Sequence, residues 1–382
     1  MQTKVVAIIP TYKPSSTTLK LVGALNLWNP EVQIIVVDDC TPAKHQRVLT
    51  EIMNLTRYLP GLEVIHTTQN RHKSGALNFG LEFVKQKNIR PDIILTFDDD
   101  VLIEKDTITI LTKALYGNNQ LGAVCSLVKI RNKNRNLLTR LQSLEYHGFN
   151  ITKLADNEVF QGPMVMPGML TAFRYQALEQ AGGFNESILI EDYAITARIK
   201  ELGWLVRIIP RATSWTKVPD NLSSLRKQRI RWTYNGLIVL RNFLHYPPSV
   251  IQDVIGHLLF IGTLGLILLS LFMRANPSPP QYVATIYIVT GIQLITSIIY
   301  NTIAMIHYQQ ADLKDWFIYF TLIPKFVYSN ILTLILLGSY FFYLYRTISP
   351  KLARRLPSYG IINALGLKLF GSLGYTDTWC TR

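Results

Sequence analysis

The stretch IILTFDDD, residues 93–100, decides the fold. Its first part, Ile93–Phe97, is apolar and β-branched and predicts a buried strand. Three carboxylates follow at once, at the position where parallel sheets bind their ligands. Alternation along an extended chain points Asp98 and Asp100 the same way. A divalent cation bridging to a diphosphate would therefore explain carboxylates that otherwise repel one another. A solvated acidic loop is the alternative.

Short apolar runs continue on both sides of this stretch, with helix-like segments between them. Besides Ile93–Phe97, the predicted strands are Val5–Ile9, Ile34–Val37, Val64–His66 and Ala123–Ile130. The predicted helices are Thr17–Trp28, Ala43–Leu59, Ser74–Lys87 and Asp106–Tyr116. Strands that alternate with helices predict an α/β fold with a mostly parallel sheet.

The alternating pattern loosens after Arg131. A helix is expected over Leu137–Phe149, and a segment rich in Pro, Gly and Met follows over Gly162–Gly168. Further helical stretches are expected near Tyr175 and Asp192. We expect this half to build the acceptor side.

Composition allows one α/β domain plus an appended module, because the chain has 382 residues and a hydrophobic content of 48%. The net charge of +14 fits nucleic acid, anionic lipid or an anionic small substrate. Basic residues gather just before the first long apolar run, which is typical of the cytosolic flank of a membrane segment. They are Arg226, Lys227, Arg229, Arg231 and Arg241. We therefore expect a lipid bilayer as a partner, and no nucleic acid.

The cysteines and the N-terminus indicate a reducing compartment. Cys40, Cys125 and Cys380 have no spacing that predicts a disulfide framework or a zinc site. The apolar stretch near the start is too short for the core of a signal peptide. We expect the N-terminal domain to stay in the cytosol.

Three apolar blocks predict an integral membrane protein of the cell or inner membrane. Val254–Met273, Tyr282–Ile306 and Trp316–Tyr345 each have the roughly 20 residues that cross a hydrocarbon core of about 30 Å. Pro324 and Lys325 interrupt the third block, so two, three and four crossings all stay open. The expected division is a catalytic domain over residues 1–245, a transmembrane region over 246–346 and a basic tail over 347–382.

Two further polar clusters lie at the predicted edge of the sheet. Asp38 and Asp39 directly follow the strand Ile34–Val37, where a carboxylate can accept hydrogen bonds from a base or ribose; an Asx turn is the alternative. Asn70–Gly75, which includes Lys73, opens a helix, where a cation and free backbone N–H groups suit an anionic ligand. A plain helix start with surface charges explains this segment equally well.

Two motifs in the second half of the domain also carry chemistry. Glu191 and Asp192 precede a helix, where acidic residues stabilise the helix N-terminus; the functional interpretation makes Asp192 a general base. Gln228, Arg231 and Trp232 stand at i, i+3 and i+4, so a helix gathers an amide, a guanidinium and an indole on one face. That face fits a sugar, and a juxtamembrane basic helix with a Trp anchor is the alternative.

The order of these motifs resembles processive family-2 glycosyltransferases, among them cellulose, chitin, hyaluronan and poly-N-acetylglucosamine synthases. The resemblance covers roughly Val5–Trp232, and its specific part is the QxxRW motif after an acidic pair. The motifs that carry it are Ile9–Tyr12, Asp38–Asp39, Asn70–Asn78, Asp98–Asp100, Gly168–Arg174, Gly182–Phe184, Glu191–Asp192 and Gln228–Trp232.

The resemblance implies a GT-A (Rossmann-like) catalytic domain followed by C-terminal transmembrane helices, and an inverting enzyme. A β-linked polysaccharide would form from UDP-N-acetylglucosamine or UDP-glucose, with Mg²⁺ or Mn²⁺ as cofactor. By matching positions, Tyr12 and Asp39 lie near the uracil and Lys73 near the nucleotide. Asp98 and Asp100 serve the diphosphate and the metal, and Asp192 is the base. Gln228, Arg231 and Trp232 lie beside the acceptor end and the leaving pyrophosphate.

Departures from the family pattern keep other interpretations open. His72, Ile190 and Ala194 stand where the family more often has glycine, threonine and a polar residue. Relatives that secrete polymers generally also have membrane helices before the catalytic domain, so a homodimer or an export partner is expected if this chain secretes polymer. One alternative is non-processive transfer of a single sugar to a lipid-linked acceptor. The other is a catalytically silent, nucleotide-binding membrane protein.

Overall fold

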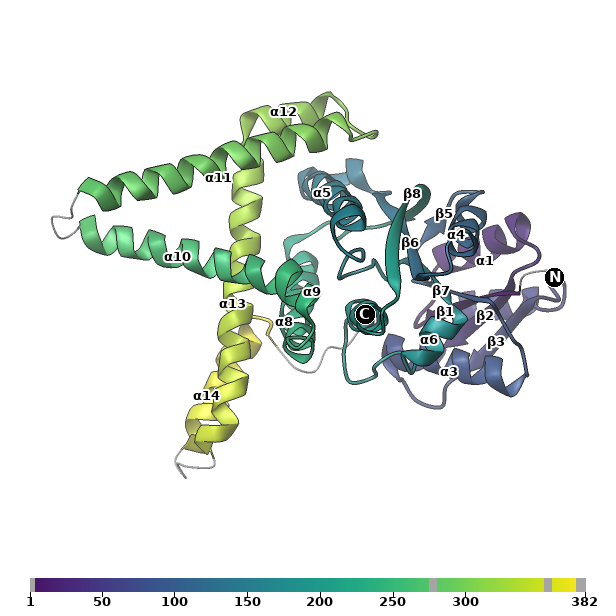
Figure 1. Ribbon diagram of the computed structural model, residues 1–382. Helices are drawn as coiled ribbons and strands as arrows, with labels where there is room; N and C mark the ends of the chain where they lie inside the picture. The colour runs from purple at the N-terminus through teal and green to yellow at the C-terminus, as the bar shows by residue number, and fades with distance from the viewer. Residues whose placement is uncertain (1–3, 275–279, 354–358, 376–382) are drawn as a thin grey trace. The chain divides into compact units, whose positions relative to one another are not determined.

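The computed structural model describes residues 4–274, 280–353 and 359–375 (Figure 1). Its internal contacts divide the chain into two units. The first holds Met1–Arg241 and Ile323–Arg382, and the second holds Asn242–Leu322. Cys40 is exposed and Cys125 is buried, whereas Cys380 lies outside the described residues.

Within the described residues, one eight-stranded sheet forms the centre of the first unit, in the order β3-β2-β1-β4-β7-β6-β8-β5. Strand β1 is parallel to β2 and β4, β2 to β3, and β6 to β8. Strand β7 is antiparallel to both β4 and β6, and β5 to β8. The strands are β1 Val5–Thr11, β2 Gln33–Asp38, β3 Leu62–His66, β4 Ile93–Phe97, β5 Leu102–Ile103, β6 Leu121–Ile130, β7 Leu170–Arg174 and β8 Leu205–Thr216.

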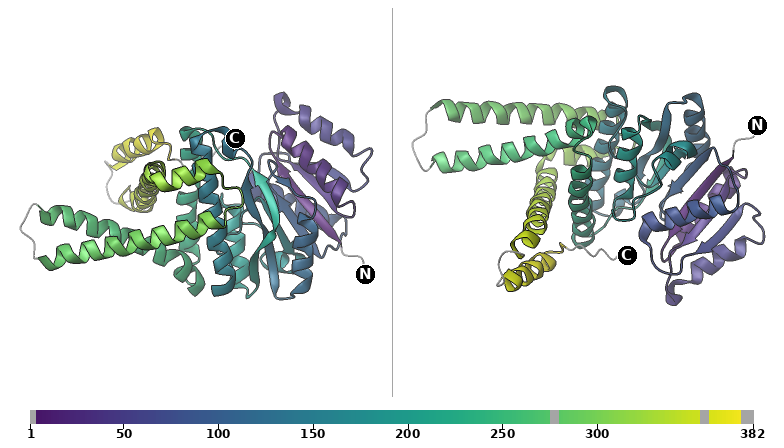
Figure 2. Two further views of the ribbon diagram at one scale, coloured as in Figure 1. Left: turned by 90° about the horizontal axis from the view of Figure 1, so that it is seen from above. Right: turned by 60° about the horizontal axis from the view of Figure 1, so that its bottom comes forward.

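Helices cover both faces of this sheet, as the two views in Figure 2 show. Along β1, Val5, Ala7 and Ile9 belong to a core with helices α1 and α4, whereas Val6 and Ile8 belong to a core with α3 and α7. A strand that is buried on both faces has a nearly continuous apolar sequence, and β1 has such a sequence. The helices of this unit are α1 Ser16–Trp28, α2 Arg47–Leu55, α3 His72–Gln86, α4 Thr107–Gly117, α5 Leu137–Val159, α6 Tyr175–Gln180, α7 Glu191–Glu201, α8 Leu222–Asn242, α13 Ile323–Ala353 and α14 Tyr359–Ser372.

The predicted α/β fold is confirmed, with several differences in its parts. The five predicted strands are present, but β5, β7 and β8 were not predicted, and they bring the antiparallel pairs. The helix predicted over Ala43–Leu59 is a short 3₁₀ turn, Ala43–His45, followed by α2. Helix α5 continues ten residues beyond the predicted end, to Val159.

The C-terminal helix α14 packs on α13 and returns the chain to α8 (Figure 1). The Tyr345 hydroxyl on α13 donates to the backbone oxygen of Asn363 on α14 at 2.8 Å. Tyr375, which follows α14, donates to the Ile335 backbone oxygen at 3.0 Å. Its ring is 7% exposed and packs with Ile230 and Tyr234 of α8. The region predicted to be a basic tail therefore contains a packed helix.

Replacing Tyr375 by alanine should lower the free energy of unfolding by about 3 kcal/mol, because it empties a packed aromatic position. The apparent melting temperature of the detergent-solubilised chain measures this. Leu373→Ala is the matched control, since Leu373 is 49% exposed and should change stability little. Equal melting temperatures for the two variants would show that Tyr375 adds nothing to the packing of α8.

The second unit is a set of helices with exposed apolar side chains. Its elements are α9 Pro247–Ser249, a π-helical turn Val250–Val254, α10 Ile255–Arg274, α11 Pro280–Ile306 and α12 Leu313–Thr321. Three stretches of the described chain are long and apolar enough to cross a membrane: Pro247–Leu266, Tyr287–Ile306 and, in the first unit, Ile323–Ser349. The third predicted block is broken at Leu322, between α12 and α13.

Candidate active site

Lys73 stands at the centre of a cluster of carboxylates beside the end of β4. Its Nζ lies 2.6 Å from Asp98 Oδ1 and 2.6 Å from Glu191 Oε1, and it donates to the Gly168 backbone oxygen at 3.1 Å. Burial alone would lower the pKa of Lys73, but Asp98 and Glu191 raise it above its ordinary value. Lys73 therefore stays a cation, and it neutralises carboxylates drawn from two separate parts of the chain.

Asp192 lies in the same pocket, in the first turn of α7. Its Oδ2 accepts a hydrogen bond from the Gly168 N–H at 3.0 Å, and its Oδ1 accepts one from the Tyr193 N–H at 2.8 Å. A Cβ at position 168 would lie 2.9 Å from Lys73 Nζ and 3.2 Å from Asp192 Oδ2, so a larger residue there would displace these side chains. The pocket is lined by Lys73, Leu77, Thr96, Met166, Gly168, Thr171, Phe173, Phe184, Glu191, Asp192, Ile195 and Thr196.

Asp39 holds the neighbouring loops together at the ends of β1 and β2. Its backbone N–H donates to the Thr11 oxygen at 2.8 Å. Its Oδ1 accepts hydrogen bonds from the Arg71 N–H at 2.8 Å and from the Thr67 hydroxyl at 3.0 Å. Burial raises the pKa of Asp39, and these hydrogen bonds oppose the rise. Tyr12 directly follows β1. The Nζ of its neighbour Lys13 lies over the Tyr12 ring, 4.6 Å from the ring centroid.

The three aspartates after β4 do not continue the strand. Strand β4 ends at Phe97, and residues 99 and 100 form a turn. The alternation argument for Asp98 and Asp100 is therefore wrong, since it required an extended chain. Asp98 faces Lys73, and Asp99 Oδ2 accepts a hydrogen bond from the Thr11 hydroxyl at 2.7 Å.

The chemistry of this cluster fits a divalent cation that a substrate phosphate helps to hold. Among the described residues, no group of three or more His, Cys, Asp or Glu side chains could hold a metal ion by itself. Mg²⁺ is commonly bound by one or two carboxylates together with substrate phosphates and water. Asp98 offers a carboxylate in this cluster, and Asp100 stands in the turn that follows it, so a substrate diphosphate would have to supply the remaining oxygens.

Gln228, Arg231 and Trp232 lie on helix α8, as predicted, but none of them lines the pocket around Lys73. Trp232 packs in a second cluster with Tyr146, Val128 and Val218. Met169 joins the two places, because it packs against this cluster and its oxygen accepts a hydrogen bond from the Asp98 N–H at 3.1 Å. The buried atoms Gln228 Oε1 and Arg231 Nε have no hydrogen-bond partner within the described part of the chain.

The sequence did not indicate three residues that surround this α8 face. Glu145, Arg229 and Tyr328 form a buried polar group there, described below. Arg229 was noted only as one of the basic residues before the membrane blocks. Glu145 and Tyr328 gave no signal, because each stands alone in a helix pattern.

A model of the family described as "Glycosyl transferase family group 2" matches residues 93–345, which is more than half of the chain. The chain belongs to this family. The matched region runs from β4 and its aspartates through α7 and α8 to the membrane-type helix α13. This family-2 chain is therefore a glycosyltransferase, as the resemblance implied.

Curated relatives of this family-2 glycosyltransferase match its catalytic part. A poly-beta-1,6-N-acetyl-D-glucosamine synthase of Staphylococcus epidermidis is 28% identical over 240 residues, which cover 62% of this chain and 55% of the relative. A probable glycosyltransferase of Bacillus subtilis, YdaM, is 27% identical over 244 residues, which cover 63% and 57%. The chain spans little more than half the length of the curated relatives it matches.

A solved structure with the same architecture supports the GT-A fold. The mannosyltransferase PcManGT from Pyrobaculum calidifontis, solved with GDP-Man and Mn²⁺, aligns over 80% of this chain and 84% of its own, with a TM-score of 0.57. At 20% identity this likeness concerns the fold alone. The expectation of a GT-A catalytic domain followed by apolar C-terminal helices is confirmed.

Proposed function

We propose that this family-2 glycosyltransferase transfers a sugar, with inversion, from a UDP-sugar to a growing β-linked polysaccharide at the membrane. UDP-N-acetylglucosamine and UDP-glucose are the donors that we favour. The observation that carries the proposal is the arrangement of Lys73, Glu191 and Asp192 around Gly168 in one pocket, with Asp98, just after β4, paired to Lys73. The names of the curated relatives support N-acetylglucosamine as the sugar.

The donor would bind along the carboxyl edge of the sheet. Tyr12 and Asp39, at the ends of β1 and β2, would contact the uracil end. Lys73 would then face the diphosphate, and its ammonium group, already paired with Asp98, would attract the phosphate oxygens. Asp98 and Asp100 would hold Mg²⁺ or Mn²⁺, which, when bound, supplies further positive charge to the diphosphate.

Asp192 would act as the general base. It accepts the proton of the attacking hydroxyl while that oxygen bonds to the anomeric carbon and the bond to UDP breaks. A single displacement inverts the anomeric centre, so an α-linked donor gives a β-linked product. The Gly168 N–H holds one carboxylate oxygen of Asp192, and this fixes the direction from which the hydroxyl can approach.

The α8 motif would complete the acceptor side. Trp232 offers a flat ring on which a pyranose can stack, and Gln228 and Arg231 carry buried polar atoms that can pair with a hydroxyl or a phosphate oxygen. The acceptor is a glycan or a lipid-linked sugar. We place the catalytic domain, residues 1–245, in the cytosol, and residues 246–346 in the bilayer. A homodimer or an export partner would complete any path for a long product.

Removing divalent metal with EDTA should abolish transfer, and Mn²⁺ or Mg²⁺ should restore it. Asp98→Asn should raise the metal concentration needed for half-maximal activity by about tenfold, which corresponds to about 1.4 kcal/mol. Titration of UDP release against metal concentration measures both effects. Asp106→Asn, outside the pocket, is the control and should leave the metal requirement unchanged. Full activity in EDTA would exclude the metal from the reaction.

The test of the function is UDP release by the purified chain in detergent with Mn²⁺ or Mg²⁺. UDP-glucose, UDP-N-acetylglucosamine, UDP-glucuronate and UDP-galactose would be compared, and the products sized. Release with one UDP-sugar and a long product supports the proposal and names the sugar. Short products from a lipid-linked acceptor would favour transfer of a single sugar. Metal-dependent UDP binding without release from any donor would favour a catalytically silent nucleotide-binding protein.

A further inference from the structure

A buried cluster of three polar side chains, Glu145, Arg229 and Tyr328, connects helices α5, α8 and α13 next to the proposed acceptor residues of α8. Arg229 Nη1 donates to Glu145 Oε1 at 3.1 Å, and Nη2 donates to Oε2 at 2.7 Å. The Tyr328 hydroxyl donates to the same Oε2 at 2.6 Å. The side chains of Arg229 and Glu145 are only 6% and 15% exposed. A bidentate, buried pair of this kind fixes the orientation of the guanidinium plane.

The guanidinium of Arg229 in turn contacts the ring of Trp232. Its Cζ lies 4.6 Å from the ring centroid, within the range of a cation–π interaction. Tyr146, next to Glu145 on α5, approaches the same indole with ring centroids 6.3 Å apart. Trp232 thus contacts both an α5 tyrosine and an arginine whose own position depends on Glu145. The indole orientation follows from residues that do not themselves belong to the QxxRW motif.

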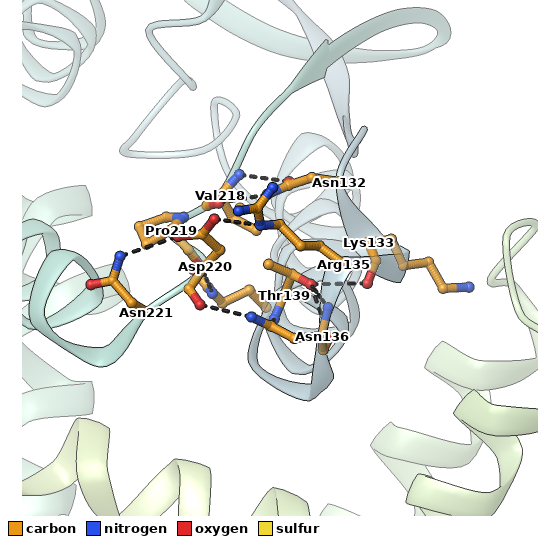
Figure 3. A network of polar contacts seen from close by, with 10 residues as sticks. Asn132, Lys133, Arg135, Asn136, Thr139, Val218, Pro219, Asp220 and Asn221 are labelled. Atoms are coloured by element: carbon orange, nitrogen blue, oxygen red, sulfur yellow. Dashed lines mark hydrogen bonds and ion pairs between the residues drawn. The ribbon is translucent and has the colours of Figure 1, made fainter.

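A separate network holds the start of α5 against the loop that leads into α8 (Figure 3). Arg135 Nε lies 2.5 Å from Asp220 Oδ2, and Asn136 Nδ2 donates to the Asp220 backbone oxygen at 2.7 Å. Asn132 exchanges two hydrogen bonds with the backbone of Val218, at 2.8 and 3.0 Å. These contacts tie the start of α5 to the loop before α8 without using Glu145 or Tyr328. Loss of a single hydrogen bond at Glu145 should therefore turn side chains, while the helices stay together.

We propose that Glu145 and Tyr328 are positioning residues for the acceptor. They hold the Arg229 guanidinium against Trp232 and so set the indole plane on which the acceptor sugar stacks. The inference rests on the proposed function, because it assumes that Trp232 binds the acceptor. It also gives α13, a candidate membrane span, a direct contact with the acceptor side through Tyr328.

The test compares variants of this chain in detergent, with UDP-N-acetylglucosamine and short N-acetylglucosamine oligosaccharides. UDP-glucose and short glucose oligosaccharides replace them if those are what the unchanged enzyme uses. Tyr328→Phe and Glu145→Gln should each raise the acceptor KM about tenfold, the effect expected from losing a hydrogen bond to a charged group. UDP binding should change less than about twofold, because the donor pocket lies elsewhere. Tyr345→Phe loses a hydroxyl from the same helix, where it bonds to Asn363, and should keep the acceptor KM.

A double variant separates positioning from stability. Glu145→Met with Arg229→Met replaces the buried pair by apolar side chains, an exchange that is often neutral or stabilising. It should fold and bind UDP, yet keep the raised acceptor KM, because no guanidinium then lies over Trp232. An unchanged acceptor KM in this variant and in Tyr328→Phe would overturn the inference.

Direct binding of the oligosaccharide to the UDP-loaded chain, followed by tryptophan fluorescence, gives a readout that needs no turnover. Tyr328→Phe should raise the dissociation constant about tenfold, in line with the KM. An enzyme that binds the oligosaccharide with this dependence but transfers nothing would refute the proposed function and leave the positioning role supported. An unchanged chain that binds none of the oligosaccharides would overturn both.

Discussion

Replacing Asp192 by asparagine should abolish sugar transfer while UDP binding stays close to that of the unchanged enzyme. The amide keeps the size of the carboxylate and can still accept the Gly168 N–H through its oxygen. It cannot take up the proton of the attacking hydroxyl. General-base catalysis typically contributes a factor of about 10²–10⁴, so the transfer rate should fall about 10³-fold. Transfer rates with the preferred donor and UDP titrations measure the two quantities.

Glu201→Gln is the matched control for this variant. Glu201 ends the same helix, α7, and its Oε2 accepts a hydrogen bond from Arg198 Nη1 at 2.6 Å, away from the pocket residues. Its loss should leave the transfer rate within about twofold, because the partly exposed Arg198–Glu201 pair does not line the pocket. An active Asp192→Asn enzyme would remove Asp192 from the role of base. Loss of UDP binding in that variant would mean instead that Asp192 shapes the donor pocket.

The N-terminal half of the fold could be predicted because its signals are local. Strands β1, β2 and β4 are apolar on both faces, so a continuous apolar run marks each of them, and polar residues mark the edge where they end. The positions of Asp39 and Asp98 followed from that pattern alone. The meeting of Lys73 with Glu191 did not, because these residues are far apart in the sequence and only the resemblance related their motifs.

The later strands escaped prediction because their sequences mix signals. Strand β8 contains Pro210 and two arginines, Arg207 and Arg211, and its pairing with β6 shifts register near Ser126. Proline normally demotes a run to an edge strand or a bulge, and this strand is irregular at that place. Strand β7 is short and lies between β4 and β6, where tertiary pairing decides the conformation more than propensity does.

The sequence predicted only some of the proposed acceptor-side residues, for a related reason. The QxxRW spacing placed Gln228, Arg231 and Trp232 on one helix, and the structure agrees. The residues that position Trp232 come from helices that are distant in the sequence. Glu145 on α5 is 84 positions from Arg229 and 183 positions from Tyr328 on α13. A lone glutamate in one helix and a lone tyrosine in another carry no periodic signal, so only the folded chain relates them.

Arg229→Met should be the most destabilising of the single substitutions at this group. It leaves the Glu145 carboxylate buried without its cation, and removing one partner of a buried pair costs about 3–5 kcal/mol. Burial already raises the pKa of Glu145 above its ordinary value, although Arg229 lowers it. Without the guanidinium, the pKa should rise further. The apparent melting temperature of the detergent-solubilised variant at neutral pH measures the loss.

The pH dependence of that loss identifies its cause. A carboxyl group whose pKa is higher in the folded than in the unfolded state binds its proton more tightly when folded. The penalty is therefore present above the raised pKa and disappears as the pH falls through it toward the ordinary value. Arg229→Met should approach the melting temperature of the unchanged chain in mildly acidic buffer, while Glu145→Met with Arg229→Met should show no such recovery, because it carries no buried carboxyl group. A deficit in Arg229→Met that is the same at both pH values would assign the loss to packing around Trp232, and the charge of Glu145 would then have no part in it.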